Sequence, residues 1–80
     1  MKVYEVKDIL AEVYCTDVAI VAANCEMEAY LLVADKYTSD NYYKVITFES
    51  AMRIGHIKEI PELEYKGNDH KIISSTLYVE

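Results

Sequence analysis

The sequence predicts an α+β fold, in which one main helix packs on a mainly antiparallel sheet of about four strands. Residues 18–23 are all apolar and three of them are β-branched, which indicates a strand buried on both faces. A segment with helical spacing of its apolar residues follows at about 25–37. The other apolar segments are shorter and rich in β-branched and aromatic residues, which favours strands. This order is typical of one helix on one face of a sheet.

We expect the strands at residues 2–13, 18–23, 42–49 and 72–79. Residues 2–13 are ambiguous, because the apolar residues at positions 6, 9, 10 and 13 also have the spacing of a helix face. We favour a strand, because Asp8 is the only capping candidate and would lie inside such a helix. The turn-forming pair Thr16-Asp17 then predicts a hairpin that joins residues 2–13 to 18–23.

Between the last two strands the sequence indicates little regular structure. Ser50 is able to cap a single helical turn at 51–54, which Gly55 would end. Residues 57–63 surround Pro61, and we expect them to be irregular. Residues 66–69 have the composition of a turn.

The main helix is predicted to use Asn24 as its N-cap, with Glu26 and Glu28 in the first turn, where the helix dipole favours negative charge. Its apolar residues form two adjacent stripes, which are Met27, Tyr30, Leu31 and Ala34, and Ala29, Leu32, Val33 and Tyr37. A surface helix normally has one apolar face. We therefore expect this helix to be covered on more than its sheet side.

Length and charge limit the classes of function. Eighty residues form a single domain, 1–80, with a small core. The net charge is −6 and the basic residues are scattered, so nucleic acids and anionic membrane surfaces are disfavoured as direct partners. Charges interrupt the first residues and no apolar run reaches the length of a membrane span. We expect a cytoplasmic protein with reduced cysteines.

The residues that could carry chemistry are isolated from one another in the sequence. Cys25 falls at the start of the helix, which lowers a thiol pKa, but Glu26 and Glu28 oppose this, and we interpret Cys25 as a packing residue. The other cysteine, Cys15, lies about 20 Å away along an extended strand, too far for a disulfide. Zinc sites use closely spaced pairs of ligands, and the sequence contains none. Its isolated ligand candidates are Cys15, Cys25, His56 and His70.

A group of carboxylates, Glu59, Glu62 and Glu64, flanks Pro61, and we interpret it as a solvated acidic loop. The sequence has no glycine-rich phosphate loop and no nucleophile motif. The prediction is a protein that is not an enzyme, with no catalytic, cofactor or metal residues.

The composition is 52% hydrophobic with eight tyrosines, which is high for so small an interior and predicts a contact surface. We expect a homodimer, through the second helix stripe rather than the uncharged last strand. The candidate interface residues are Ala29, Leu32, Val33, Tyr37, Tyr42 and Leu77. The predicted function is that of a small accessory protein with an unknown protein partner. The alternative is an acidic nucleic-acid mimic that blocks a DNA-binding enzyme, which would require one continuous acidic face.

The strand-to-helix junction Ala22-Ala23-Asn24, followed by Glu28-Ala29 in the helix, resembles a module of small bacterial and mobile-element proteins of the DpnD/PcfM-like group. The resemblance covers residues 2–48. It implies a short hairpin before an acidic-capped helix, and an accessory protein carried by a phage or a conjugative element. It implies no catalytic residue.

Overall fold

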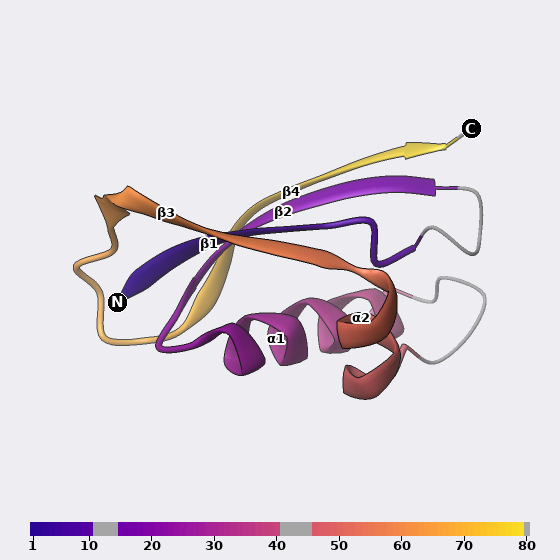
Figure 1. The fold of residues 1–80 in the computed structure, drawn as a ribbon, viewed down its shortest axis with the longest axis horizontal. Coiled ribbons are helices and arrows are strands. Elements are labelled where there is room, and N and C mark those ends of the chain that lie inside the picture. The colour runs from indigo at the N-terminus through magenta and orange to yellow at the C-terminus, as the bar shows by residue number, and fades with distance from the viewer. Residues whose placement is uncertain (11–14, 41–45, 80) are drawn as a thin grey trace.

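The computed structural model describes residues 1–10, 15–40 and 46–79, and these form two layers (Figure 1). The elements in chain order are β1 (Lys2–Lys7), β2 (Cys15–Ala23), α1 (Glu26–Ser39), α2 (Phe48–Ile54), β3 (His56–Glu64) and β4 (Lys71–Val79). The strands form one sheet in the order β3-β1-β2-β4, and all neighbours are antiparallel. Both helices lie on the same side of the sheet (Figure 1). The predicted α+β class and antiparallel sheet are confirmed, whereas the single main helix is a correction, because there are two.

β1 and β2 form the predicted antiparallel pair, but the first strand is shorter than residues 2–13. The predicted turn at Thr16-Asp17 is wrong, because both residues lie in β2. β1 ends at Lys7, and Asp8 adopts a left-handed backbone conformation with a φ of 64°. Aspartate tolerates this conformation better than most residues, and it turns the chain out of the strand. The predicted residues 11–14 lie outside the described part of the chain.

The second helix, α2, begins where we predicted the end of a strand at 42–49. The side-chain oxygen of Thr47 accepts a hydrogen bond from the backbone amide of Ser50 at 3.1 Å, which is an N-cap. Just before it, Ile46 is held by Thr38 of α1, whose hydroxyl accepts from the Ile46 amide at 2.9 Å. This capping outweighs the strand preference of residues 45–48. Residues 42–45 lie outside the described segments.

The third strand, β3, replaces the irregular segment that we predicted at 57–63. Glu59 of β3 pairs with Tyr4 of β1, and Glu64 of β3 pairs with Lys2, so residues 60–63 of β3 form an outward bulge between these two pairs. Pro61 lies in this bulge at the edge of the sheet, where a missing N–H costs no ladder hydrogen bond. A proline therefore did not prevent a strand here.

The last strand, β4, extends over the predicted residues 72–79 and forms the other edge, beside β2. Its pairing shifts between Ile20 and Val21 of β2, so Ile73 is an extra residue without a partner in the register. The connection from β3 to β4 passes the start of β1. There the backbone of Tyr65 exchanges two hydrogen bonds with Met1, at 2.9 and 3.0 Å.

The core lies between the sheet and the two helices. Its buried residues include Tyr4 and Val6 of β1 and Val21 of β2. From the two predicted stripes of α1, the buried residues are Ala29, Tyr30, Val33, Ala34 and Tyr37. In the described residues, no helix is long and apolar enough to cross a membrane.

Candidate interaction surfaces

The residues predicted to form an interface on α1 are part of the core. Ala29, Val33 and Tyr37 have exposed fractions of 0%, 0% and 3%. Leu32 and Leu77 are partly buried and pack against the core, and Tyr42 lies outside the described residues. These side chains already pack within one copy of the chain. Self-association stays a prediction, and it requires a surface other than the buried stripes of α1.

The reason for this burial is the second helix. We expected α1 to be covered on more than its sheet side, with a second copy of the chain over its second stripe. Instead, α2 packs beside α1, and Ala51 of α2 and Ile46 are buried in the same cluster as both stripes of α1. Of the two stripes, only Met27 and Leu31 remain strongly exposed, at 59% and 48%. They are four residues apart and therefore lie on one face of the helix.

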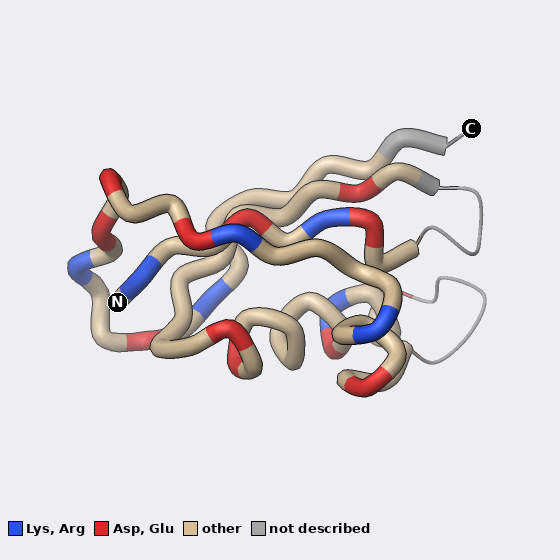
Figure 2. Tube along the Cα trace, viewed as in Figure 1, with Lys and Arg blue, Asp and Glu red and all other residues tan. Residues whose placement is uncertain are grey.

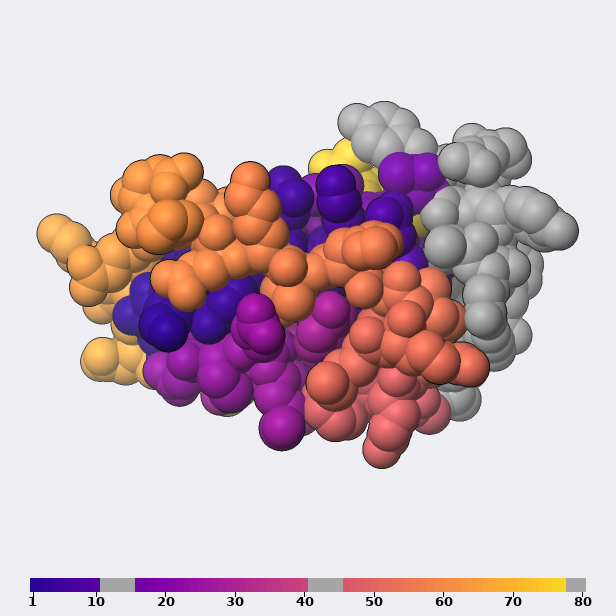
Figure 3. All heavy atoms as spheres, in the orientation of Figure 1, coloured from indigo at the N-terminus to yellow at the C-terminus, as the bar shows by residue number. Residues whose placement is uncertain are grey.

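Two open depressions lie side by side where β3, the start of β1 and the start of α1 meet, a region visible on the left in Figure 3. The first is lined by Lys2, Tyr4, Cys25, Glu26, Met27 and Glu59. The second is lined by Met1, Lys2, Glu59, Pro61, Leu63 and Glu64. They share Lys2 and Glu59. We call the residues that line both depressions the front surface.

The front surface has apolar side chains within a charged rim. Met27 and Leu63, at its two ends, are 59% and 51% exposed. Between them, the Lys2 ammonium lies 3.9 Å from the Glu59 carboxylate, and both side chains are largely exposed, so this ion pair contributes little stability. Burial raises the pKa of the Tyr4 hydroxyl, and the Glu59 and Glu26 carboxylates raise it further, so Tyr4 is neutral here.

Asn24 is not the N-cap that we predicted. The N-cap is Cys25, whose side chain makes no capping hydrogen bond. The Glu28 carboxylate instead reaches back and accepts from the Asn24 backbone amide at 3.1 Å and from its side-chain amide at 3.4 Å. The same oxygen lies 3.3 Å from Nδ1 of His70, which links the start of α1 to the segment before β4. Glutamate in the first turn, rather than asparagine before it, supplies the acceptor.

The cysteine, histidine and glutamate side chains that could take part in chemistry are not brought together in the part of the chain that the structure describes. Cys25 is a free thiol with an exposed side chain, not the packed residue that we expected. His56 lies 3.8 Å from Asp8, and His70 lies beside Glu28 at another part of the molecule. Glu59, Glu62 and Glu64 are spread along β3. The described residues contain no group of three or more histidines, cysteines and carboxylates that could hold a metal ion.

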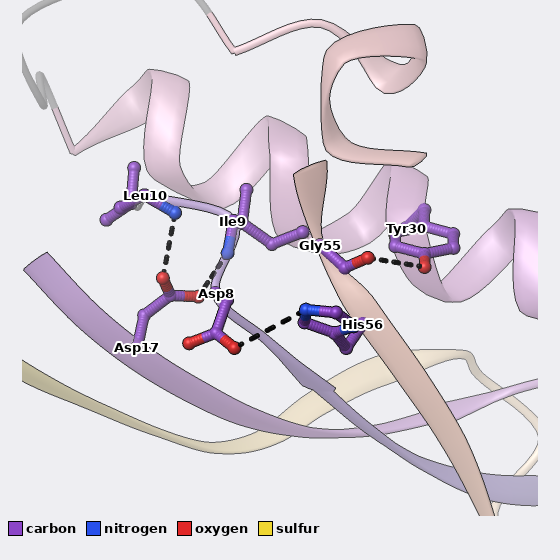
Figure 4. A network of polar contacts seen from close by, with 7 residues as sticks. All are labelled: Asp8, Ile9, Leu10, Asp17, Tyr30, Gly55 and His56. Carbon is purple, nitrogen blue, oxygen red and sulfur yellow. Dashed lines mark hydrogen bonds and ion pairs between the residues drawn. The ribbon is translucent and has the colours of Figure 1, made fainter. Parts of the chain in front are cut away.

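Asp17 is a polar residue whose importance the sequence did not reveal. It is 0% exposed, and its two carboxylate oxygens accept hydrogen bonds from the backbone amides of Leu10, at 2.8 Å, and Ile9, at 3.2 Å (Figure 4). Burial raises the pKa of the Asp17 carboxyl, and the two amides and the Tyr37 side chain act in the opposite direction. The carboxylate fixes the turn after β1 onto β2, which is a structural role rather than a catalytic one.

No protein-family model matches the chain, and no curated protein or solved structure is significantly similar to it. The resemblance of residues 2–48 to the DpnD/PcfM-like group stays an expectation. Support for a contact at the front surface or at the free edge of β4 is therefore geometric.

Proposed function

We propose that this protein is a non-enzymatic interaction protein that binds a partner protein through the front surface. The observation that carries the proposal is the exposure of Met27 and Leu63, at 59% and 51%, on either side of two adjoining depressions. Apolar side chains surrounded by a polar rim are the usual arrangement of a protein contact. Methionine also adapts its shape to a partner at small cost, because its side chain is unbranched and flexible.

The charges at the rim favour a partner of mixed charge. Lys2 lies between Glu26, Glu59 and Glu64, so both signs are present within the front surface. A partner that places an acidic group near Lys2 and basic groups near the glutamates would match it. Such complementarity affects specificity and the rate of association more than affinity.

The distribution of charge gives less support to the acidic mimic. Figure 2 shows aspartates and glutamates on β1, β2, both helices and β3, with lysines and arginine among them. One of these acids, Asp17, is buried. A mimic of a phosphate backbone needs its carboxylates on one continuous face, so this mixed pattern favours the interaction protein.

A comparison of two equal charge substitutions tests the proposal. Met27→Glu places a charge in the front surface, and glutamate in the first turn of α1 suits the helix dipole. Met52→Glu is the matched control, because Met52 is 48% exposed and lies on α2, outside the front surface. Tagged wild-type protein and both variants are used for affinity capture from source cells, with mass spectrometry.

We expect one protein to be captured by the wild type and by Met52→Glu, and to be lost with Met27→Glu. Equal capture by all three proteins would show that the partner binds elsewhere, and the proposal for the front surface would then be wrong. Circular dichroism of each variant confirms that the fold is retained.

A further inference from the structure

We propose that two copies of this chain pair through β4, so that their sheets join across a two-fold axis into one antiparallel sheet of eight strands. The axis passes near Ser75, in the middle of β4. This inference does not rest on the proposed function, because the front surface includes the β3 edge and β4 is the opposite edge of the sheet. The contact would consist mainly of backbone hydrogen bonds.

The first observation is the free edge of β4. β4 pairs with β2 along one side, and no other described strand lies along its outer side. Residues 72–79 contain no charged residue and no proline. The middle of the strand, Ser74, Ser75 and Thr76, is exposed. A long uncharged edge of this kind presents unpaired N–H and C=O groups that another strand can satisfy.

The second observation is that the opposite edge is protected. The register of β3 skips residues 60–63, with Pro61 among them, whereas that of β4 skips only Ile73. The charged residues of β3 are Lys58, Glu59, Glu62 and Glu64. These are the features by which natural sheets prevent pairing at an edge. A sheet extended at β4 therefore cannot be extended further at β3.

The difference between the β3 and β4 edges indicates which chain would pair with β4. If a second copy pairs through its own β4, both unprotected edges are satisfied at once, and the joined sheet ends in a protected β3 edge on each side. The assembly is closed, as expected for an isologous dimer. An unrelated extended peptide on β4 would leave its own outer edge open. The second copy is therefore the occupant that the two edges favour.

Charge and side chains agree with this arrangement. Each copy has a net charge of −6, which opposes association, but on β4 the charge is confined to Lys71 at its start (Figure 2). On the helix side, Ile72 and Leu77 are only partly buried against the core. The two-fold axis places both pairs of helices on the same side of the joined sheet, so these side chains line the seam and lose exposed apolar area. Pairing centred on Ser75 also puts hydroxyl groups opposite one another.

The first test is sedimentation equilibrium of the wild type and of two lysine variants. Ser75→Lys places two positive charges opposite each other across the axis. Ser39→Lys adds the same charge at an exposed position at the end of α1. We expect a reversible equilibrium between the 9.2 kDa monomer and the dimer. Ser75→Lys should weaken it by up to about fivefold, because like charges directly opposite are unfavourable. Ser39→Lys should not weaken it.

The second test uses a conservative substitution that leaves the fold intact. In a chain whose two native cysteines are replaced by serine, Ser75→Cys places two thiols opposite each other, at a separation that a disulfide can bridge. Mild oxidation should give a covalent dimer that a reductant reverses. Ser39→Cys, in the same background, should give little.

Three results would overturn the proposal. They are a wild type that remains monomeric at high micromolar concentration, a dimer equally strong in Ser75→Lys and Ser39→Lys, and equal cross-linking of the two cysteine variants. Met27→Glu is expected to dimerise normally. A failure of the dimer and a failure of the front surface are therefore separate results.

Discussion

The two edges of this sheet have opposite kinds of sequence. β3 combines a proline and four charged side chains, whereas β4 has no proline and its single charge at the first residue. Each edge strand also contains a bulge, which is wider in β3 than in β4. Both edges belong to the same small sheet, and both flank the same central hairpin. The difference shows that edge protection is a property of the sequence and not of the fold. It also means that different contacts stabilise the two sides of the molecule, so single substitutions are able to test each side separately.

The largest effect is expected from Asp17→Ala, on the β4 side. Asp17 pairs with Leu77 of β4 in the register and holds the amides of Ile9 and Leu10. Alanine would leave two buried donors without this acceptor, and each loss of this kind costs about 1–3 kcal/mol. Urea denaturation should therefore show a loss of about 3 kcal/mol. Asp17→Asn keeps one acceptor oxygen and should lose less. A similar small loss in both variants would contradict the anchoring role.

A smaller effect is expected from Gly55→Ala, at the start of β3. A Cβ at Gly55 would overlap the Ile9 side chain and lie 2.9 Å from the backbone oxygen of Ala51, which cannot move easily. Overpacking of this kind costs about 1–3 kcal/mol. At Gly67, before β4, the Cβ meets only the ring of Tyr65, the end of a flexible side chain. Gly67→Ala should therefore cost less in the same urea experiment, and the reverse order would contradict this account.

The smallest effect is a dependence of stability on pH that arises on the β4 side. Because burial raises the folded-state pKa of Asp17, this residue favours folding most at pH values below its unfolded pKa, about 4. That contribution is lost as the pH rises through the folded-state pKa. The free energy of unfolding of the wild type, compared with that of Asp17→Asn, should therefore decrease from acidic toward neutral pH. The exposed carboxylates of β3 are common to both proteins, so their effect cancels when the two unfolding free energies are subtracted. If the subtracted value increases with pH instead, the hydrogen bonds to the Asp17 carboxylate outweigh the effect of burial on its pKa.

Local patterns predicted part of this fold. The apolar run at 18–23, the helical spacing at 25–37 and the strand-forming composition of 72–79 correspond to β2, α1 and β4, because each pattern extends over enough residues to outweigh the alternatives. One element was predicted only in part and one was missed. The predicted helical turn at 51–54, ended by Gly55, lies within α2, which begins earlier, at Phe48, and β3 was predicted to be irregular. Thr47 caps a helix inside a segment that has the composition of a strand, and Pro61 lies within a strand because that strand is an edge. Whether a strand lies at an edge depends on neighbours that a local pattern does not contain. The Thr47 cap is local, but the residue before it, Ile46, is held by Thr38 of α1, which the local pattern does not contain.

The candidate surfaces were harder to predict than the elements. The front surface joins Lys2 to Glu59, from opposite halves of the chain, so no local motif marks it. The stripes of α1 suggested a contact surface, but α2, which covers one side of the helix, was itself not predicted in full. The number of tyrosines was a poor guide to the surface, because Tyr30 and Tyr37 are buried in the core and Tyr4, although it lines the front surface, is only 2% exposed.

The strand order also affects how the chain folds. β1 and β2 are close in sequence, but their outer partners come from the other end of the chain, as the pairs Lys2–Glu64 and Cys15–Val79 show. Pairings between distant residues slow folding, because the loop must close before the contact contributes. β4 is also synthesised last, so β2 keeps an open side until β4 arrives. At high concentration during refolding, the β4 of another molecule is a competitor for that place, and exchange of this strand is the misfolded product that we would look for first.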